Sequence, residues 1–187
     1  MNNRYSFIGG TQGDWRVTAM RPVIGAGLDI VERLDIVNTA LTEVLADSAW
    51  VLQSFVSNVR YANREEITML RSVQPSLNRL EALVAVLIPI KKNAQWWDMA
   101  QDERRAIFEE QSHHTAVGMK YLPEVARQLH HCRDLGEPFD FLTWFEFAPE
   151  HTQAFDELLL RMRDTKEWNY VEREVEVWLH RALERGL

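Results

Sequence analysis

Residues 114–146, HTAVGMKYLPEVARQLHHCRDLGEPFDFLTWFE, contain the clearest structural pattern in the chain. The beginning of this stretch predicts a short helix that carries His114 and ends at Pro123, because proline disfavours helical geometry at the residue before it. Residues 125–133 then predict a strand, and the Asp-Leu-Gly-Glu-Pro segment predicts a turn. Residues 139–147 predict a second, very apolar strand. We therefore expect a helix and two strands here, in a domain of the α+β class.

The same pattern continues toward the C-terminus. Residues 150–163 predict a helix, and residues 170–180 predict a last strand. In this strand one side carries Val171, Arg173, Val175, Val177 and Leu179, and the other carries Glu172, Glu174 and Glu176. Such alternation predicts one buried side and one side that faces solvent.

Four more strands are expected before this stretch, at residues 5–8, 15–23, 50–59 and 82–90. The first three are short segments bounded by turn residues or alternating in polarity, and the fourth is an apolar run typical of a buried strand. Apolar residues at three- and four-residue spacing predict a helix over residues 28–45.

Two further helices have recognisable start signals. One should begin after the N-cap Asn63, with Glu66 at the capping-box position, and should stop near Gln74 before a proline. The other covers residues 102–110, and Ser112 after it is a suitable N-cap for the His114 helix. The complete order predicts two related α+β halves whose sheets pack together, and a closed or half-closed barrel is one way to achieve this.

Composition narrows the classes of function. The chain has 187 residues, seven Trp and a net charge of −7, so a nucleic-acid partner has no electrostatic support. An acidic protein also repels small anions, so an anionic substrate needs a local cation in its site. Cys132 is the only cysteine, which excludes an intrachain disulfide and a metal site built from several thiolates. The N-terminus does not resemble a secretory signal and no apolar run has the length of a membrane span, so we expect a cytoplasmic protein.

His114 is the first candidate for a functional residue. On a helix it shares a face with Val117, Gly118 and Tyr121. A glycine one turn after a histidine leaves room for a broad group to lie against the helix. By spacing alone, an ordinary buried or surface histidine is the more frequent outcome than a metal ligand.

Arg127 and Glu167 are the next candidates. Arg127 lies between Val125 and Leu129 on one side of a strand, and it keeps its charge at ordinary pH, so it can bind an anion. Glu167 lies between a helix and a strand, and a carboxylate that accepts the outer N–H of a ligating imidazole makes the ring a stronger donor. Their ordinary alternatives are a structurally paired arginine and a solvated glutamate.

Lys92, Trp96 and Trp97 form a tight group in the sequence. A lysine and two tryptophans at the edge of a pocket suit a flat hydrophobic cofactor with carboxylate tails, although a surface lysine and two core rings would look the same. Gln74 is a polar side chain that has the reach to hydrogen-bond an arginine.

Several long motifs, in order, resemble the chlorite dismutase family, and in particular its short, dimeric branch. In the C-terminal half the motifs are LIPIKKNAQWW (87–97), QDERRAIFEEQSHH (101–114), YLPEVARQLHHCRDLGEPFDFLTWFEFAPEH (121–151) and EWNYVEREVEVWL (167–179). WVLQSFVSNVRY (50–61) and LRSVQPSL (70–77) agree more loosely in the first half. The resemblance implies two ferredoxin-like halves, a truncated one at residues 1–99 and a haem-binding one at residues 100–187, in a homodimeric protein.

The resemblance also implies haem b and a role for each candidate. His114 would be the proximal iron ligand, with its ring hydrogen-bonded to Glu167, and Arg127 would lie over the distal face. Gln74 matches the residue that holds the distal arginine. The further cofactor-binding candidates are Lys92, Trp96, Trp97 and Leu129.

The implied reaction converts chlorite to chloride and O₂ through hypochlorite and a ferryl haem. Three alternatives remain at this point: a coproheme decarboxylase of the same family, a haem peroxidase, and a haem-binding protein without turnover. Arg127 argues against the decarboxylase, because a glutamine is typical of that position in one of its branches. No role is predicted for Arg60, Tyr61, His130, His131 or His151.

Overall fold

The computed structural model describes residues 3–41, 47–56 and 61–182. Eight strands form one closed barrel in the order β1-β3-β2-β8-β5-β7-β6-β4. They are β1 Arg4–Gly10, β2 Trp15–Ile24, β3 Arg33–Val37, β4 Ser48–Phe55, β5 Val84–Lys92, β6 Ala126–His131, β7 Phe141–Phe147 and β8 Val171–Arg181. All the strand pairs are antiparallel.

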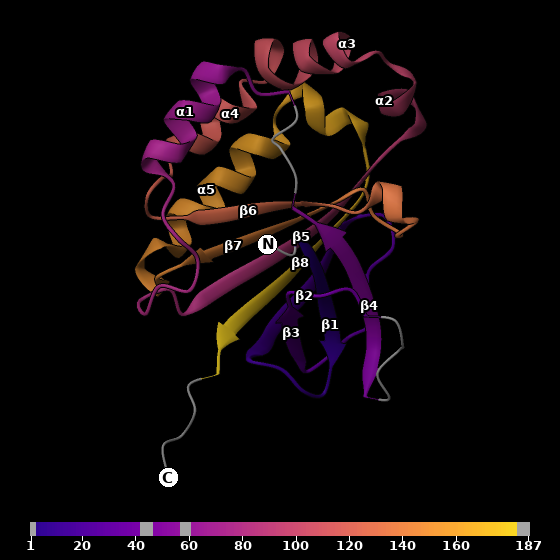
Figure 1. Ribbon diagram of the computed structural model, residues 1–187, viewed down its shortest axis with the longest axis vertical. Helices are drawn as coiled ribbons and strands as arrows, with labels where there is room; N and C mark the ends of the chain where they lie inside the picture. Colours follow the sequence, from indigo (N-terminus) through magenta and orange to yellow (C-terminus); the bar gives the residue numbers. More distant parts are fainter. Residues whose placement is uncertain (1–2, 42–46, 57–60, 183–187) are drawn as a thin grey trace.

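Five α-helices accompany the barrel: α1 Arg64–Val73, α2 Ala94–Asp98, α3 Gln101–Arg105, α4 His114–Met119 and α5 Thr152–Arg163. Figure 1 shows them gathered on one side of the molecule, over β5 to β8, while β1 to β4 lie on the other side. Shorter helical segments are a π-helical turn at Ala106–Gln111 and 3₁₀ turns at Arg133–Leu135, Pro149–His151 and Lys166–Tyr170. Within the described residues, no helix has the length and apolar character needed to cross a membrane.

The sheet has two buried faces, and each packs into a separate core. The core inside the barrel includes Phe7, Trp15, Leu34, Leu87, Trp144 and Val177. The second core lies between the outer face of the sheet and the helices, and it includes Ile88, Phe145, Phe147, Phe155 and Met162. Alternate residues of β5 and β7 therefore go to different cores, as the two-residue period of a strand requires.

Most elements expected from the sequence are present within a few residues of the expected bounds. The capping box of α1 is confirmed, because Asn63 Oδ1 accepts from Glu66 N at 2.9 Å and Glu66 Oε2 accepts from Asn63 N at 2.7 Å. The strand predicted at 50–59 ends at Phe55, and its last three predicted residues lie outside the described part of the chain.

Helix α1 is connected to the rest of the domain near both ends. The Glu66 carboxylate accepts two hydrogen bonds from Arg105, at 2.8 and 2.7 Å, and Gln74 Nε2 donates to the main-chain oxygen of Arg127 at 2.6 Å. The hydrogen bonds from Arg105 lower the pKa of Glu66 below its ordinary value. The helix is therefore tied to the α3 region at its start and to β6 at its end.

The helix predicted over residues 28–45 is wrong. Residues 33–37 form β3, which pairs with β1 from Ser6↔Val37 to Gly10↔Arg33 and with β2 at Trp15↔Leu34. Leu34 is fully buried inside the barrel. The helical spacing of the leucines and valines in this segment is overridden by the pairing that closes the sheet. Residues 42–46 lie outside the described part of the chain.

The prediction that Glu174 and Glu176 face solvent is also wrong. They are 0% and 5% exposed, respectively, and only Glu172 of that side is exposed. Both carboxylates accept hydrogen bonds from Arg163 at the end of α5. The outer face of β8 is thus covered by a helix, and its charges are compensated within the protein.

Candidate functional site

A cavity of about 720 Å³ lies between the outer face of the sheet and helices α1, α4 and α5. Its floor is made by alternate residues of β5, β6 and β7, including Ile88, Ile90, Phe141 and Phe145, and Leu158 of α5 closes one side. The volume and the mainly apolar walls are typical of a cofactor or small-molecule site. Of the candidates from the sequence, His114, Arg127, Gln74, Leu129, Lys92, Trp96 and Glu167 all line this cavity.

His114 is the first residue of α4, and two contacts fix the orientation of its ring. Its Nδ1 lies 2.6 Å from Glu167 Oε2, and the Phe108 ring stacks on it with centroids 4.2 Å apart and an interplanar angle of 21°. The contact with Glu167 occupies one ring nitrogen. Nε2 is therefore the nitrogen of His114 that is suited to coordinate a metal.

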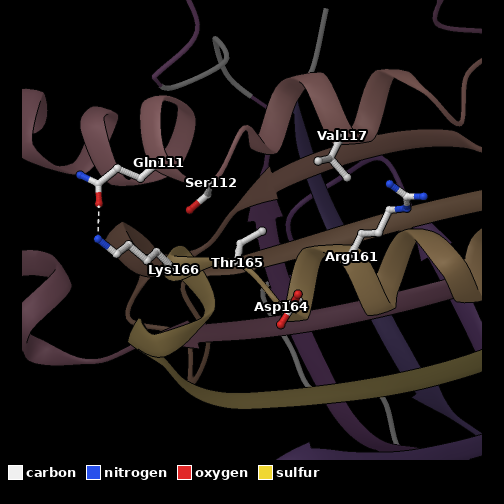
Figure 2. A pocket seen from close by; sticks show the side chains of 7 residues that line it. All are labelled: Gln111, Ser112, Val117, Arg161, Asp164, Thr165 and Lys166. Carbon is white, nitrogen blue, oxygen red and sulfur yellow. Dashed lines mark hydrogen bonds between the residues drawn. The ribbon is translucent and has the colours of Figure 1, made fainter.

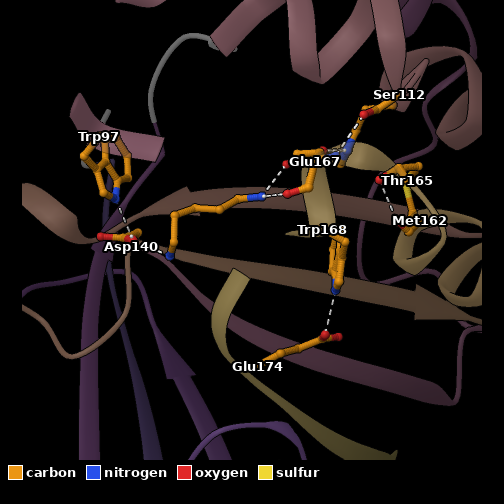
Figure 3. Close-up of polar contacts among 10 residues, drawn as sticks. Trp97, Ser112, Asp140, Met162, Thr165, Glu167, Trp168 and Glu174 are labelled. Atoms are coloured by element: carbon orange, nitrogen blue, oxygen red, sulfur yellow. Dashed lines mark hydrogen bonds and ion pairs between the residues drawn. The ribbon is translucent and has the colours of Figure 1, made fainter. Parts of the chain in front are cut away.

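The start of α4 differs from the prediction, which made Ser112 its N-cap. The N-cap position is held by His113, whose φ of 52° is uncommon for a residue other than glycine. The hydrogen bond expected of a cap comes from Glu109, whose Oε2 accepts from Thr115 N at 2.8 Å. Ser112 Oγ instead accepts from Glu167 N at 3.0 Å, so Ser112 helps to place Glu167 (Figure 3).

Glu167 is 5% exposed and is held by several groups in addition to His114. Lys92 Nζ donates to its Oε1 at 2.8 Å and to its main-chain oxygen at 3.2 Å. Burial alone would raise the pKa of Glu167, but the electrostatic interactions and hydrogen bonds with His114 and Lys92 lower it to about 2. The residue is therefore an ionised acceptor for His114 at any ordinary pH.

Lys92 and Trp96 lie together at one end of the cavity. Lys92 is 4% exposed, and its Nζ lies 4.7 Å from the Trp96 ring centroid and 5.4 Å from that of Trp168. Its charge is thus directed at Glu167 and at two aromatic faces. Trp96 is 1% exposed, and its Nε1 is a buried donor without a hydrogen-bond partner among the described residues.

Trp97 does not line the cavity. Its Nε1 donates to Asp140 Oδ2 at 3.1 Å, and its ring lies between Arg104 and Arg133, whose guanidinium carbons are 5.3 and 4.0 Å from the ring centroid. These contacts are those of a structural residue next to the site. The structure therefore separates Trp97 from the other candidates, and Figure 3 shows it beside Asp140.

Arg127 enters the cavity from β6. Burial lowers its pKa, and the negative charge of Glu109 opposes that shift, so the guanidinium remains charged. Its side chain reaches α4 at Gly118, where an added Cβ atom would lie 3.0 Å from Arg127 Nη1. Gln74 contacts the main chain of Arg127 and not its guanidinium. Arg127 of β6 and His114 of α4 thus line one and the same cavity.

Several residues of the site were missed by sequence reasoning. Phe108 and Glu109 come from a π-helical turn, and no sequence pattern distinguishes such a turn from an ordinary helix. Tyr61 and His131 also line the cavity. His130, on the opposite side of β6, is buried against Tyr5 and Phe7, and this burial lowers its pKa to about 3. Arg60 lies outside the described residues, and His151 ends a 3₁₀ turn away from the cavity.

A second, smaller hollow of about 490 Å³ lies beside α4 and the end of α5 (Figure 2). Its walls are mostly polar, and Lys166 Nζ donates to Gln111 Oε1 at 3.0 Å across it. The part of the chain that the structure describes contains no group of three or more His, Cys, Asp or Glu side chains that could hold a metal ion. A metal in the large cavity would therefore need a cofactor to supply ligands beyond those of the described side chains.

Comparisons with known proteins show which proteins this chain resembles. The sequence profile of the family described as chlorite dismutase matches residues 2–183. The crystal structure of a dimeric chlorite dismutase from Nitrobacter winogradskyi is 52% identical and superposes with a TM-score of 0.90, covering 95% of this chain and 99% of that one. A variant chlorite dismutase from Candidatus Nitrospira defluvii is 27% identical with a TM-score of 0.60, over 72% of this chain and 56% of that one.

The similarity to longer relatives is partial. A chlorite dismutase from Ideonella dechloratans is 35% identical over 86 residues, which is 46% of this chain but only 28% of that protein. The profile match nevertheless extends over nearly the whole chain. The chain therefore belongs to the chlorite dismutase family.

Proposed function

We propose that this protein is a haem b-dependent chlorite dismutase, which converts chlorite to chloride and O₂ and acts as a homodimer. The observation that carries the proposal is the presence, in one cavity, of His114 held by a buried carboxylate and of the cationic side chain of Arg127. The relative from Nitrobacter winogradskyi, at 52% identity, is itself reported as a dimeric chlorite dismutase.

The donor set of the cavity fits haem. A single neutral imidazole suits an iron whose equatorial ligands come from a porphyrin. The unsatisfied Nε1–H of Trp96 fits a carboxylate tail, because a buried donor without a partner is costly and a cofactor carboxylate would satisfy it. His114, Trp96 and Leu129 would hold the group, and Lys92 would act through Glu167. When bound, haem supplies the iron that exchanges oxygen with the chlorine oxyanion.

Glu167 and Lys92 would set the strength of the His114 ligand. A carboxylate that accepts the Nδ1–H of a ligating histidine makes Nε2 a better electron donor and stabilises higher oxidation states of the metal. Lys92 lies 2.8 Å from the same carboxylate and holds it in place, while taking up part of its charge. The strength of the ligand is therefore a balance between these two contacts.

Arg127 would bind the anionic substrate and retain the oxyanion released from it. The protein carries a net charge of −7, so a chlorite ion approaches against the overall field and needs a local cation. In mainly apolar surroundings a guanidinium forms charge-assisted hydrogen bonds with an oxyanion that are stronger than those in water. Two other cations line the cavity: Arg71 of α1 is exposed, and Lys92 is committed to Glu167.

We further propose that the barrel consists of two ferredoxin-like halves, of which the N-terminal one has no helix between its strands within the described residues. In the barrel order, β4-β1-β3-β2 and β8-β5-β7-β6 each read fourth, first, third, second within their own group. The second group has helices between its first and second and between its third and fourth strands, as a βαββαβ unit does. Because β5 belongs to this group, the pairing favours a boundary before Val84 over one at residue 99.

Replacing Trp96 by phenylalanine should have opposite effects on the haem-free and haem-loaded protein. Removal of an unsatisfied buried donor should leave the free energy of unfolding of the haem-free protein unchanged or raise it by about 1 kcal/mol. Haem affinity should fall about tenfold, because one hydrogen bond to a charged group is lost. Thermal unfolding and haem titration measure the two effects. Trp97→Phe is the matched control and should leave haem affinity unaltered; equal haem affinity in wild type and Trp96→Phe would contradict the assigned contact.

The function is tested by loading the full-length protein with haem b and adding chlorite anaerobically at an oxygen electrode. The expected result is one O₂ and one chloride for each chlorite consumed. Haem binding without O₂ release would overturn the proposal, and assays for coproheme decarboxylation and peroxidase activity would then identify the reaction. The variant His114→Ala is the control, because it should bind haem weakly and release no O₂.

A further inference from the structure

Glu167 lies in the connection between α5 and β8, within the 3₁₀ turn Lys166–Tyr170. A short turn of this kind has few internal hydrogen bonds of its own. The position of the Glu167 carboxylate relative to His114 therefore depends on whatever fixes this turn to the domain. Ser112 and Lys92 hold the main chain of Glu167 from one side.

Glu174 fixes the same turn from the other side. It is 0% exposed, and its Oε2 accepts from Trp168 Nε1 at 2.9 Å, as Figure 3 shows. Its Oε1 accepts from Arg163 Nε at 3.0 Å. One buried carboxylate thus joins the last residue of α5, the neighbour of Glu167 and strand β8.

Burial of an ionised carboxylate is costly unless strong hydrogen bonds compensate for it. Glu174 does not line the cavity, and neither does Arg163. Trp168 does line it, so its indole connects Glu174 to the edge of the site. A hydrophobic residue at position 174 would fill the space but would leave the indole N–H and the guanidinium without this acceptor.

We propose that Glu174 is a positioning residue, which acts through Trp168 to hold the Glu167 carboxylate at hydrogen-bonding distance from His114. This inference rests on the function proposed above, since it assigns a role toward the ligand of the haem iron. Glu174 itself contacts neither the cavity nor His114. Its effect is on the geometry of the His114–Glu167 contact.

Glu176 provides a matched comparison on the same strand. It is 5% exposed, accepts from Arg163 Nη2 at 2.6 Å and accepts from the indole of Trp178 at 2.7 Å. It therefore shares its burial, its arginine and its type of partner with Glu174. Trp178, however, is in β8 and does not line the cavity. Loss of the Glu176 charge should therefore weaken the contacts of Arg163 and Trp178 and leave the turn that carries Glu167 unaffected.

The experiment compares the haem-loaded wild type with Glu174→Gln, Glu176→Gln and Glu167→Gln by resonance Raman spectroscopy of the ferrous iron–histidine stretch. We expect Glu174→Gln to lower this frequency, as Glu167→Gln does, and Glu176→Gln to leave it at the wild-type value. Both Glu174→Gln and Glu176→Gln should lower the unfolding temperature. A wild-type frequency in Glu174→Gln, or an equal shift in Glu176→Gln, would overturn the inference while leaving the proposed function intact. No shift in Glu167→Gln would overturn the proximal assignment itself.

A second measurement does not require haem. The exchange rate of the Glu167 backbone N–H, which donates to Ser112, is measured by NMR in the full chain. It should rise about tenfold in Glu174→Gln and in Trp168→Phe, because each loses one hydrogen bond to a charged group. It should stay unchanged in Glu176→Gln. If Glu174→Gln does not fold, the Trp168→Phe variant tests the inference alone. An unaltered exchange rate in that variant would show that the Trp168–Glu174 hydrogen bond does not position Glu167.

Discussion

Replacement of Arg127 by alanine is expected to lower the rate of chlorite conversion by about 10²-fold while haem remains bound. This magnitude is typical for the loss of one preorganised group that stabilises a developing oxyanion. The haem should also bleach faster during turnover, because the released oxyanion would no longer be retained next to the iron. Oxygen release and haem absorbance, recorded together as a function of chlorite added, measure the rate and the lifetime of the enzyme.

Arg127→Lys is the control for charge. Lysine keeps the cation but not the planar fork of the guanidinium, so it should recover part of the rate and less of the lifetime. Gln128→Ala changes another residue that lines the cavity on the same strand without removing a charge, and it should retain most of the activity. If Arg127→Ala turned over and bleached like the wild type, the anion site would have to lie elsewhere.

Replacement of Glu167 by glutamine should weaken haem binding by about 10- to 100-fold, the usual effect of losing the partner of a ligating histidine. A neutral amide is a poorer acceptor for the Nδ1–H of His114, so the iron–histidine frequency should fall and the haem reduction potential should rise. Spectroelectrochemistry and haem titration measure these changes. The variant also leaves Lys92 buried without its carboxylate, and this should lower the free energy of unfolding by about 3 kcal/mol.

The two consequences can be separated with a double variant. Lys92→Met together with Glu167→Gln removes both charges of the buried pair, so much of the stability should return while the potential stays high. A double variant with wild-type potential would indicate that Lys92, and not Glu167, determines the donor strength of His114. Unchanged potential and frequency in the single variant would show that Glu167 is not the functional partner of His114.

Local signals in the sequence predicted local structure well. The capping box of Asn63 and Glu66 is present at the predicted positions, because both partners lie within one turn of the chain. The helix predicted over residues 28–45 failed for the opposite reason. Its residues pair with β1 and β2, and no pattern within the segment contains information about those distant strands. The burial of Glu174 likewise depends on Arg163, eleven residues away on another element.

In the candidate site too, local sequence patterns do not predict contacts between distant parts of the chain. His114, Arg127 and Glu167 were identified from family motifs, whereas their contacts come from tertiary structure. Lys92 was expected at the carboxylate tails of a cofactor, but the fold brings it to Glu167, 75 positions further along the chain. Phe108 was missed because an apolar residue in a helix normally faces a core, and only the fold places its ring against an imidazole.

The attachments of α1 at both ends have a consequence for the width of the site. The helix is fixed by Glu66 to Arg105, just before the π-helical turn that leads to His114, and by Gln74 to the strand that carries Arg127. Its ten residues have a length of about 15 Å. Helix α1 therefore connects, over a fixed length, the segment that leads to His114 with the strand that carries Arg127. The width of the cavity between these two attachments is set by the polypeptide itself.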